Sequence, residues 1–342
     1  MQFGIVDHMD KGTTSIATCY ADRLNLIQLY ESLGFRAYHM AEHHGTPLSI
    51  SPSPNLFLAA AAVKTTRIRL GTLVNVLPLY HPVRLIEEVC MLDHMTGGRL
   101  ELGGGKGASP VELGLYGVDP DCARDQFQEM LSILVAGLTS DVLTHHGTHY
   151  DINDVPMALR PVQQPHPPLW YGVRDPERSA WCAEREINTV ALLPSGRVRP
   201  LTDRYREQWT ALGRDPDALP FIGVTRSIVI APSAKAAMDS AKRAFKLWRE
   251  SLDYLWVQAG ITSTLEGVIP HDFEEWHAAG EAFAGTPDAA REFVEAQVDA
   301  AGINYMAVRA AFGDLTPEEV ATTTRLFAEH VMPAFASQPI PA

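Results

Sequence analysis

The chain has 342 residues, of which 46% are hydrophobic and 20% are charged, a balance typical of a globular protein with a sizeable core. The formal net charge of −13, with 13 His counted as neutral, argues against nucleic-acid or anionic-membrane binding as a main role. No run of about 18 apolar residues predicts a membrane span. The first residues lack the pattern of a signal peptide, so we expect a cytoplasmic protein.

Short apolar segments with strand-like composition alternate with amphipathic, helix-like segments along most of the chain. In chain order, we predict a strand over 2–6, a helix over 21–33 closed by Gly34, a strand over 36–41, a helix over 54–64, a strand over 68–77, a helix over 83–95, a strand over 99–102 and a helix over 125–137. After a Pro-rich excursion at 140–168 with at most a small hairpin, we predict a strand over 169–173, a helix over 177–185, a strand over 189–193, a helix over 202–212, a strand over 221–230, a helix over 234–253, a loop over 260–286, a helix over 287–301, a strand over 305–309 and a helix over 317–330.

These segments form eight βα units with no break suited to a domain boundary. Eight such units close most simply into a (β/α)8 TIM barrel of the α/β class, with insertions after several strands. We therefore predict one barrel domain over 1–335 and a tail over 336–342. A doubly wound open sheet is the main rival, but the glycine-rich turn that usually follows its first strand is missing here.

The cysteines are widely spaced and form no CxxC pair, so we predict neither a zinc nor a redox motif and expect reduced thiols. Cys90 and Cys182 fall inside helical patterns, where a free cysteine usually packs as a small apolar side chain. A histidine cluster at 145–149 resembles a set of metal ligands, but it lies in the Pro-rich excursion, where a solvated turn is expected. The first strand offers only His8 rather than an HxH pair, so we predict no metal site.

The segment Ala41-Glu42-His43-His44 follows the second predicted strand. Loops at the carboxyl ends of barrel strands carry the active site, and a histidine there can exchange a proton near neutral pH while a neighbouring carboxylate orients it. The alternative is that these histidines only form hydrogen bonds within a loop.

Two later loops could bind an anion. Lys106 lies in the glycine run 103–107. The run does not match the GxxxxGK[ST] motif of a phosphate loop, because Ala108 follows Gly107. It forms either a tight turn or a site where Lys106 neutralises a phosphate. After the fifth strand, Asp175 is a good N-cap, and Arg174 and Arg178 add positive charge at the helix start. A plain capped helix is the alternative for this second loop.

Taken together, the chain resembles the bacterial luciferase-like flavin-dependent monooxygenase family nearly from end to end. The matching motifs are Met1-Gln2-Phe3-Gly4, Ala41-Glu42-His43-His44, Gly71-Thr72 through Val76-Leu77-Pro78, His81-Pro82-Val83-Arg84, Leu92-Asp93 with Gly98-Arg99, Gly302-Ile303, and Leu326-Phe327 with Val331-Met332-Pro333. Each motif is short, but their order and spacing are specific.

The resemblance implies a TIM barrel, commonly dimeric, that binds reduced FMN or a deazaflavin at the carboxyl ends of the strands. It places the catalytic histidine at His43, beside Glu42 and His44, and the basic phosphate ligand at Lys106, where luciferase has arginine. It also places a cis peptide under the flavin ring at Leu73-Val74. The expected cofactor contacts are Leu73, Val74, Asn75, Lys106, Val173, Arg174, Asp175, Arg178 and Ser179. Family members often have small residues in the loop after the fifth strand, whereas this chain has Arg174, Asp175 and Arg178 there.

We therefore expect a monooxygenase that takes reduced FMN from a separate flavin reductase and uses oxygen to oxidise a small organic molecule. Such chemistry needs an apolar pocket that excludes water, with walls expected from Leu73, Val74, Leu77 and Leu79 and a lid from 260–286. The alternatives are a deazaflavin-dependent oxidoreductase on the same fold and a non-catalytic flavin-binding protein. A homodimer or a related heterodimer is expected.

Overall fold

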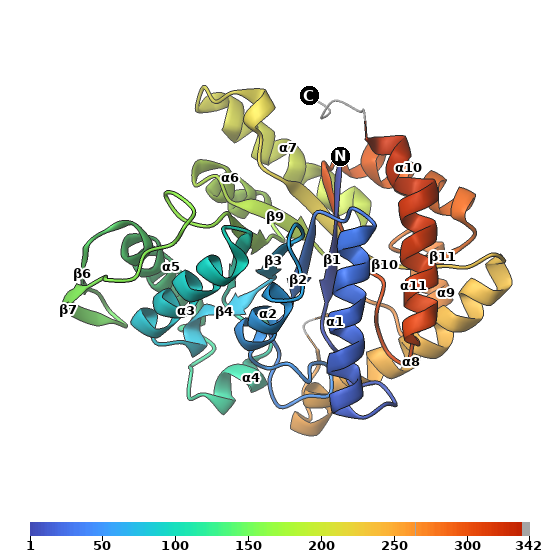
Figure 1. The fold of residues 1–342 in the computed structure, drawn as a ribbon, viewed down its shortest axis with the longest axis horizontal. Coiled ribbons are helices and arrows are strands. Elements are labelled where there is room, and N and C mark those ends of the chain that lie inside the picture. Colours follow the sequence, from blue (N-terminus) through green and yellow to red (C-terminus); the bar gives the residue numbers. More distant parts are fainter. Residues whose placement is uncertain (264, 337–342) are drawn as a thin grey trace.

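The computed structural model describes residues 1–263 and 265–336. Its centre is a closed ring of eight parallel strands, which confirms the predicted TIM barrel and all eight predicted strands (Figure 1). The ring runs in the order β1 Gln2–Asp7, β2 Ala37–Met40, β3 Arg69–Thr72, β5 Leu100–Gly105, β8 Leu169–Gly172, β9 Asn188–Ala191, β10 Ile222–Ile230 and β12 Tyr305–Arg309. It closes because β12 pairs with β1, so that Ile5 is in register with Tyr38 on one side and Val308 on the other.

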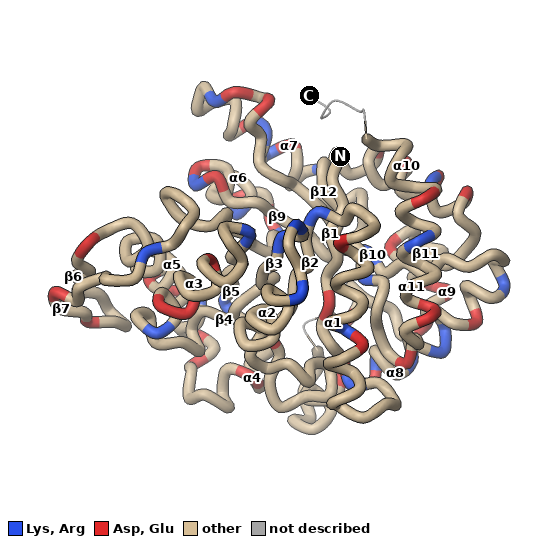
Figure 2. The backbone as a smooth tube through the Cα atoms, viewed as in Figure 1, with Lys and Arg blue, Asp and Glu red and all other residues tan. Residues whose placement is uncertain are grey.

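Helices surround this ring. They are α1 Ile16–Ser32, α2 Pro54–Ala62, α3 Pro82–Thr96, α5 Ala123–Thr139, α6 Pro176–Glu184, α7 Ser195–Ala211, α8 Ala234–Ala259, α10 Pro287–Ala301 and α11 Pro317–Leu326, followed by the short turns Phe327–Val331 and Met332–Phe335. Cys90 in α3 and Cys182 in α6 are buried, as predicted. Figure 2 shows charges of both signs interspersed over the outer helices. Among the described helices, none combines the length and apolar character needed to cross a bilayer.

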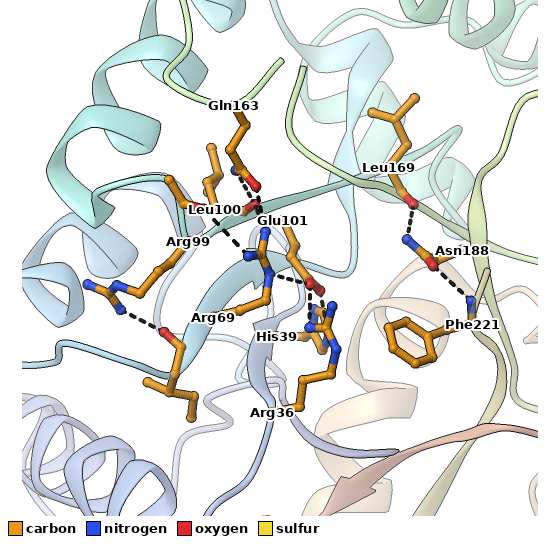
Figure 3. Close-up of polar contacts among 12 residues, drawn as sticks. Arg36, His39, Arg69, Arg99, Leu100, Glu101, Gln163, Leu169, Asn188 and Phe221 are labelled. Atoms are coloured by element: carbon orange, nitrogen blue, oxygen red, sulfur yellow. Dashed lines mark hydrogen bonds and ion pairs between the residues drawn. The ribbon is translucent and has the colours of Figure 1, made fainter. Parts of the chain in front are cut away.

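The amino-terminal end of the barrel is filled by a charged network (Figure 3). The fully buried Glu101 of β5 accepts from Arg36 Nη1 at 2.8 Å and from Arg69 Nε at 2.7 Å, and His39 Nε2 lies 3.7 Å from its second oxygen. Burial lowers the pKa of His39 to about 4, although Glu101 opposes this. These side chains occupy the barrel beside the first residues of the strands, so space for a ligand is left at the carboxyl ends.

The predicted third strand, 68–77, is interrupted. β3 ends at Thr72, the peptide between Leu73 and Val74 is cis, as the resemblance implied, and β4 follows at Asn75–Val76 before a 3-10 turn at Leu77–Leu79. The glycine run was partly misassigned to a loop, because Gly103 to Gly105 continue β5. A Cβ atom on Gly103 would lie 2.2 Å from the carbonyl oxygen of Thr72, so the two strands approach too closely for a side chain.

Several segments outside the ring differ from the prediction; among them, α7 begins seven residues earlier and α8 ends six residues later than predicted. The prediction of a single loop over 260–286, which was expected to form a lid, was wrong. The segment contains α9 Phe273–Ala278 and β11 Ala282–Gly285, and β11 pairs with the end of β10. A short helix, α4 Pro110–Leu115, was missed. α1 begins earlier than predicted, where Ser15 caps it by accepting from the amide of Thr18. The hairpin in 140–168 is confirmed as β6 Val142–His146 and β7 Asp151–Pro156. Apart from residue 336, the predicted tail lies outside the described residues.

Candidate functional site

A cavity of about 370 Å³ opens at the carboxyl ends of the strands. Every expected site residue except His44, Asn75 and Ser179 borders it. Its lining comprises Val6, His8, Ala41, Glu42, His43, Leu73, Val74, Val76, Gly105, Lys106, Gly107, Ala108, Arg124, Tyr171, Gly172, Val173, Arg174, Asp175, Arg178, Val190, Leu192, Thr225 and Arg309. The walls therefore come from the ends of all eight barrel strands and the loops after them.

His43 lies on the loop after β2 and is half-buried in the cavity wall. Its Nδ1 atom is 3.1 Å from Oε1 of Glu112, and the second oxygen of Glu112 accepts from the backbone amide of His44 at 3.1 Å. Glu112 belongs to α4, which Ser109 caps by accepting from the Glu112 amide. Because the carboxylate engages Nδ1, Nε2 is the ring nitrogen left for a ligand. Sequence reasoning missed Glu112, although Ser109-Pro110-Val111-Glu112 is a recognisable helix start.

Glu42 and His44 form a buried pair behind His43. His44 Nε2 lies 2.7 Å from Glu42 Oε1, and the amide of Val76 donates to Glu42 Oε2 at 2.7 Å. The other ring nitrogen of His44 is 2.8 Å from the hydroxyl of Tyr116. Both nitrogens of His44 are therefore engaged by protein side chains, and His44 does not border the cavity, so His43 is the histidine of the pair that faces a ligand.

The interrupted third strand supplies an apolar wall through Leu73, Val74 and Val76. Leu77 and Leu79, expected as further wall residues, do not border the cavity: Leu77 is fully buried, and Leu79 packs against the small apolar cluster of Val76, Leu113 and Ala123. The side-chain nitrogen of Asn75 donates to Glu42 and to Tyr80, so this residue supports the Glu42 carboxylate instead of lining the cavity.

Four cations gather on the wall formed by the ends of β5 and β8. Lys106, Arg174 and Arg178 were expected there, and Arg124, near the start of α5, was not. Burial lowers the pKa of Lys106, and the positive charges of Arg124 and Arg174 lower it further. Lys106, Arg124, Arg174 and Arg178 are called the cation cluster below.

The start of α6 adjoins the cation cluster. Asp175 caps the helix, since its Oδ1 accepts from the amide of Arg178 at 2.9 Å, and Pro176 occupies the first helical position, as predicted. Val173 is buried and borders the cavity. Ser179 does not reach it: the residue is fully buried, and its hydroxyl has no hydrogen-bond partner among the described residues.

The wall formed by β1, β10 and β12 contributes polar groups that sequence reasoning did not select. His8 accepts at Nδ1 from Trp248 Nε1 at 3.2 Å, and its ring lies perpendicular to that of His43 with 5.3 Å between centroids. Burial, followed by the charge of Arg309 and by His43, lowers the pKa of His8 well below its ordinary value. His8 is therefore a neutral imidazole beside His43 near pH 7.

The histidines of the hairpin lie outside the cavity. His145 contacts Glu129 at 3.0 Å, and His146 contacts Asp151 at 2.6 Å. Within residues 1–263 and 265–336, no group of three or more His, Cys, Asp or Glu side chains is arranged to hold a metal ion.

Comparison with known proteins gives a consistent picture. A family model described as luciferase-like monooxygenase matches residues 1–331. An uncharacterized protein of Sinorhizobium fredii (strain NBRC 101917 / NGR234), y4wF, is 40% identical over 316 residues, which cover 92% of each chain. The oxygenase component of the flavin-dependent trigonelline monooxygenase of Acinetobacter baylyi (strain ATCC 33305 / BD413 / ADP1) is 31% identical over 192 residues, covering 55% of this chain and 53% of the relative. Among solved structures, monooxygenase RslO1 from Streptomyces bottropensis superimposes with a TM-score of 0.88 at 26% identity, covering 98% of this chain and 100% of the other.

Proposed function

This chain belongs to the luciferase-like monooxygenase family, and from that premise we propose that it is a flavin-dependent monooxygenase that uses reduced FMN and molecular oxygen to oxidise a small organic substrate. The observation that carries the proposal is the arrangement of one cavity. The cation cluster lies at the ends of β5 and β8, and an apolar wall follows β3. His43 follows β2 and contacts Glu112 of α4.

The residues of the cavity fit FMN. A terminal phosphate is a compact anion that suits Lys106 and the three arginines of the cation cluster. Among the described residues, none of these four cations forms an ion pair with a carboxylate within 4 Å, so their charge is available to a ligand. Gly172, on the same wall, leaves open space where a side chain would project.

The remaining walls suit the flavin ring and its chemistry. Leu73 and Val74 offer an apolar surface that excludes water from one side. Bound reduced FMN would supply the electrons that activate molecular oxygen. The carboxylate of Glu112 would orient the His43 ring through Nδ1, so that Nε2 could transfer a proton to or from the ligand. Glu42 would fix the loop that carries His43 through its contacts with His44 and Val76.

Two partners follow from this proposal. A separate flavin reductase would supply reduced FMN, in keeping with a relative named as the oxygenase component of a flavin-dependent monooxygenase. A second copy of the chain would cover an apolar surface on the neighbouring helices α2 and α3, where Leu56, Val63, Met91 and Met95 are 75%, 73%, 54% and 44% exposed. We propose a homodimer, with a related chain as the alternative partner.

The test is a titration of the protein with reduced FMN and, separately, with a reduced deazaflavin, followed by measurement of oxygen uptake. We expect the FMN complex to consume oxygen in a way that depends on His43. The variant His43→Ala should bind FMN with nearly unchanged affinity and lose turnover by about 10²–10⁴-fold. A tight deazaflavin complex without oxygen consumption would point to a deazaflavin-dependent oxidoreductase. Flavin binding with no turnover under any condition would point to a non-catalytic flavoprotein.

A further inference from the structure

Arg309 is a buried cation in the cavity wall. It ends β12, is only 2% exposed, and borders the cavity. Its Nη1 donates to the hydroxyl of Ser227 at 3.1 Å, and its guanidinium carbon lies 4.7 Å from the ring centroid of Trp248. Its Nε is buried, and within residues 1–263 and 265–336 it has no hydrogen-bond partner.

The carboxylates of Asp7 and Asp10 have partners other than Arg309. Asp7 forms an ion pair with Arg23 at 2.9 Å, and Asp10 accepts from the amide of Gly313. Among the described residues, no carboxylate lies within 4 Å of the Arg309 guanidinium. Burial lowers the pKa of Arg309 to about 10, while Asp10 and Asp7 oppose this from a greater distance, so the side chain stays charged at neutral pH. A buried charge of this kind is costly unless a ligand compensates it.

The position of Arg309 separates it from the cation cluster. In the eight-stranded ring, β12 and β5 are four strands apart in either direction, so Arg309 and Lys106 stand on opposite walls. One FMN phosphate at the cation cluster leaves the charge of Arg309 uncompensated. His8 and His43, whose rings are 5.3 Å apart, line the same cavity as Arg309, and so do Val6 on the neighbouring strand β1 and Val190 on β9.

We propose that Arg309 binds the carboxylate of the organic substrate, so that the substrate class is a small organic acid with an apolar body. Arginine matches a carboxylate well because its planar guanidinium can donate several parallel hydrogen bonds. The contacts with Ser227 and Trp248 hold the guanidinium in place before a ligand arrives. The apolar side chains beside it would take the body of the acid and bring its carbon atoms toward His43. This inference rests on the proposed function for the reaction, but binding can be tested without turnover.

The experiment measures binding of matched acids and amides to the FMN-bound protein. The probes are benzoate with benzamide, cyclohexanecarboxylate with cyclohexanecarboxamide, and hexanoate with hexanamide, each pair sharing a shape and differing in charge. We expect at least one acid to bind tenfold or more tightly than its amide. The variant Arg309→Met should abolish that preference and Arg309→Lys should retain part of it. Arg84→Met, which removes a cation whose side chain is 74% exposed, should leave the preference unchanged.

Each outcome decides the inference. An acid preference that is absent from all three pairs, or one that survives in Arg309→Met, would overturn it. A loss of affinity for reduced FMN in Arg309→Met and Arg309→Lys, with the acid preference intact, would assign Arg309 to the flavin ring instead. Should Arg309→Met fail to fold, Arg309→Lys and Arg309→Gln give the same comparison. If the protein binds no FMN, the proposed function fails, whereas titrating the acids and amides into the flavin-free protein still tests Arg309.

Discussion

The Nδ1 atom of His43 lies 3.1 Å from Oε1 of Glu112, although the two residues stand on separate elements, the loop after β2 and the short helix α4. The second oxygen of Glu112 holds the backbone amide of His44, so one carboxylate fixes both the ring and the chain that carries it. Such a contact fixes the orientation of an imidazole ring. Glu112 is therefore a positioning residue for His43.

Replacing Glu112 with Gln should lower turnover by about tenfold or more, less than the loss of the histidine itself, because glutamine has a single acceptor oxygen and cannot engage both the His43 ring and the His44 amide. FMN affinity should stay within about twofold, so that the loss appears in the rate of oxygen uptake and not in flavin binding. Glu129→Gln is the matched control, since it removes a carboxylate paired with His145 outside the cavity. Equal rates of oxygen uptake for Glu112→Gln and the unchanged protein would refute the positioning role.

Replacing Lys106 with Met should weaken FMN binding by about 10–100-fold, the value of one charge-assisted hydrogen bond, and leave riboflavin binding nearly unchanged. The reason is that riboflavin lacks the phosphate assigned to the cation cluster. Titrations of both flavins at low and high salt measure the difference. Lys235→Met serves as the control, because Lys235 is exposed and paired with Asp239 on α8. Equal losses for FMN and riboflavin would place the phosphate elsewhere.

Replacing Gly103 with Ala should destabilise the fold by about 1–3 kcal/mol, as overpacking in a core does. The new Cβ atom would meet the Thr72 carbonyl oxygen at 2.2 Å, and β3 and β5 cannot separate without disturbing the ring. Urea unfolding measures the change. Gly114→Ala is the control, since a Cβ there meets nothing within 4 Å and a helical alanine is favourable. If both variants unfolded at the same urea concentration, the close approach of the strands would be in doubt.

Replacing Asp10 with Asn should stabilise the protein above neutral pH. Burial and the charge of Asp7 raise the pKa of Asp10 to about 7, although Arg23 and the amide of Gly313 lower it. Between about pH 4 and 7 the unfolded chain releases this proton while the folded chain keeps it, so the contribution of Asp10 to stability falls as pH rises. An asparagine oxygen can still accept from Gly313.

The advantage of Asp10→Asn should therefore be small at pH 4, grow toward pH 7 and level off above it, reaching at most about 4 kcal/mol from a shift of about three pH units. Urea unfolding at pH 4.5 and 8 measures this difference. Asp141→Asn, at a side chain that is 97% exposed, should show no such trend. An advantage that is the same at both pH values would contradict a buried carboxyl that titrates late.

The barrel was predictable because each of its eight strands is a short apolar run between recognisable helices. Local signals also located Asp175 and Pro176 at the start of α6. The segment 260–286 was misjudged because its five Gly and Pro residues outweighed two weak signals, the cap at Asp272 and the four apolar-rich residues of β11. The break after Thr72 was harder to foresee, since the resemblance placed a cis peptide there but the apolar run itself reads as one continuous strand.

The site was predictable only where a residue follows a strand within a distinctive motif. The path of the chain from β5 to α5 brings Glu112 to the His43 ring and Arg124 to the cavity wall, and no local pattern specifies that path. Arg309 had a usable signal, because it ends a predicted strand and strand ends face the ligand in a barrel. The predicted site residues all follow the second to fifth strands, and Arg309 at the end of the last strand was not among them.

A crystal structure of the protein with FMN tests the central claim most directly. We expect the phosphate within hydrogen-bonding distance of Lys106 and Arg174, the ring against Leu73 and Val74, and Nε2 of His43 facing the ring. A phosphate bound away from the cation cluster, or a ring that leaves His43 facing only protein, would contradict the account.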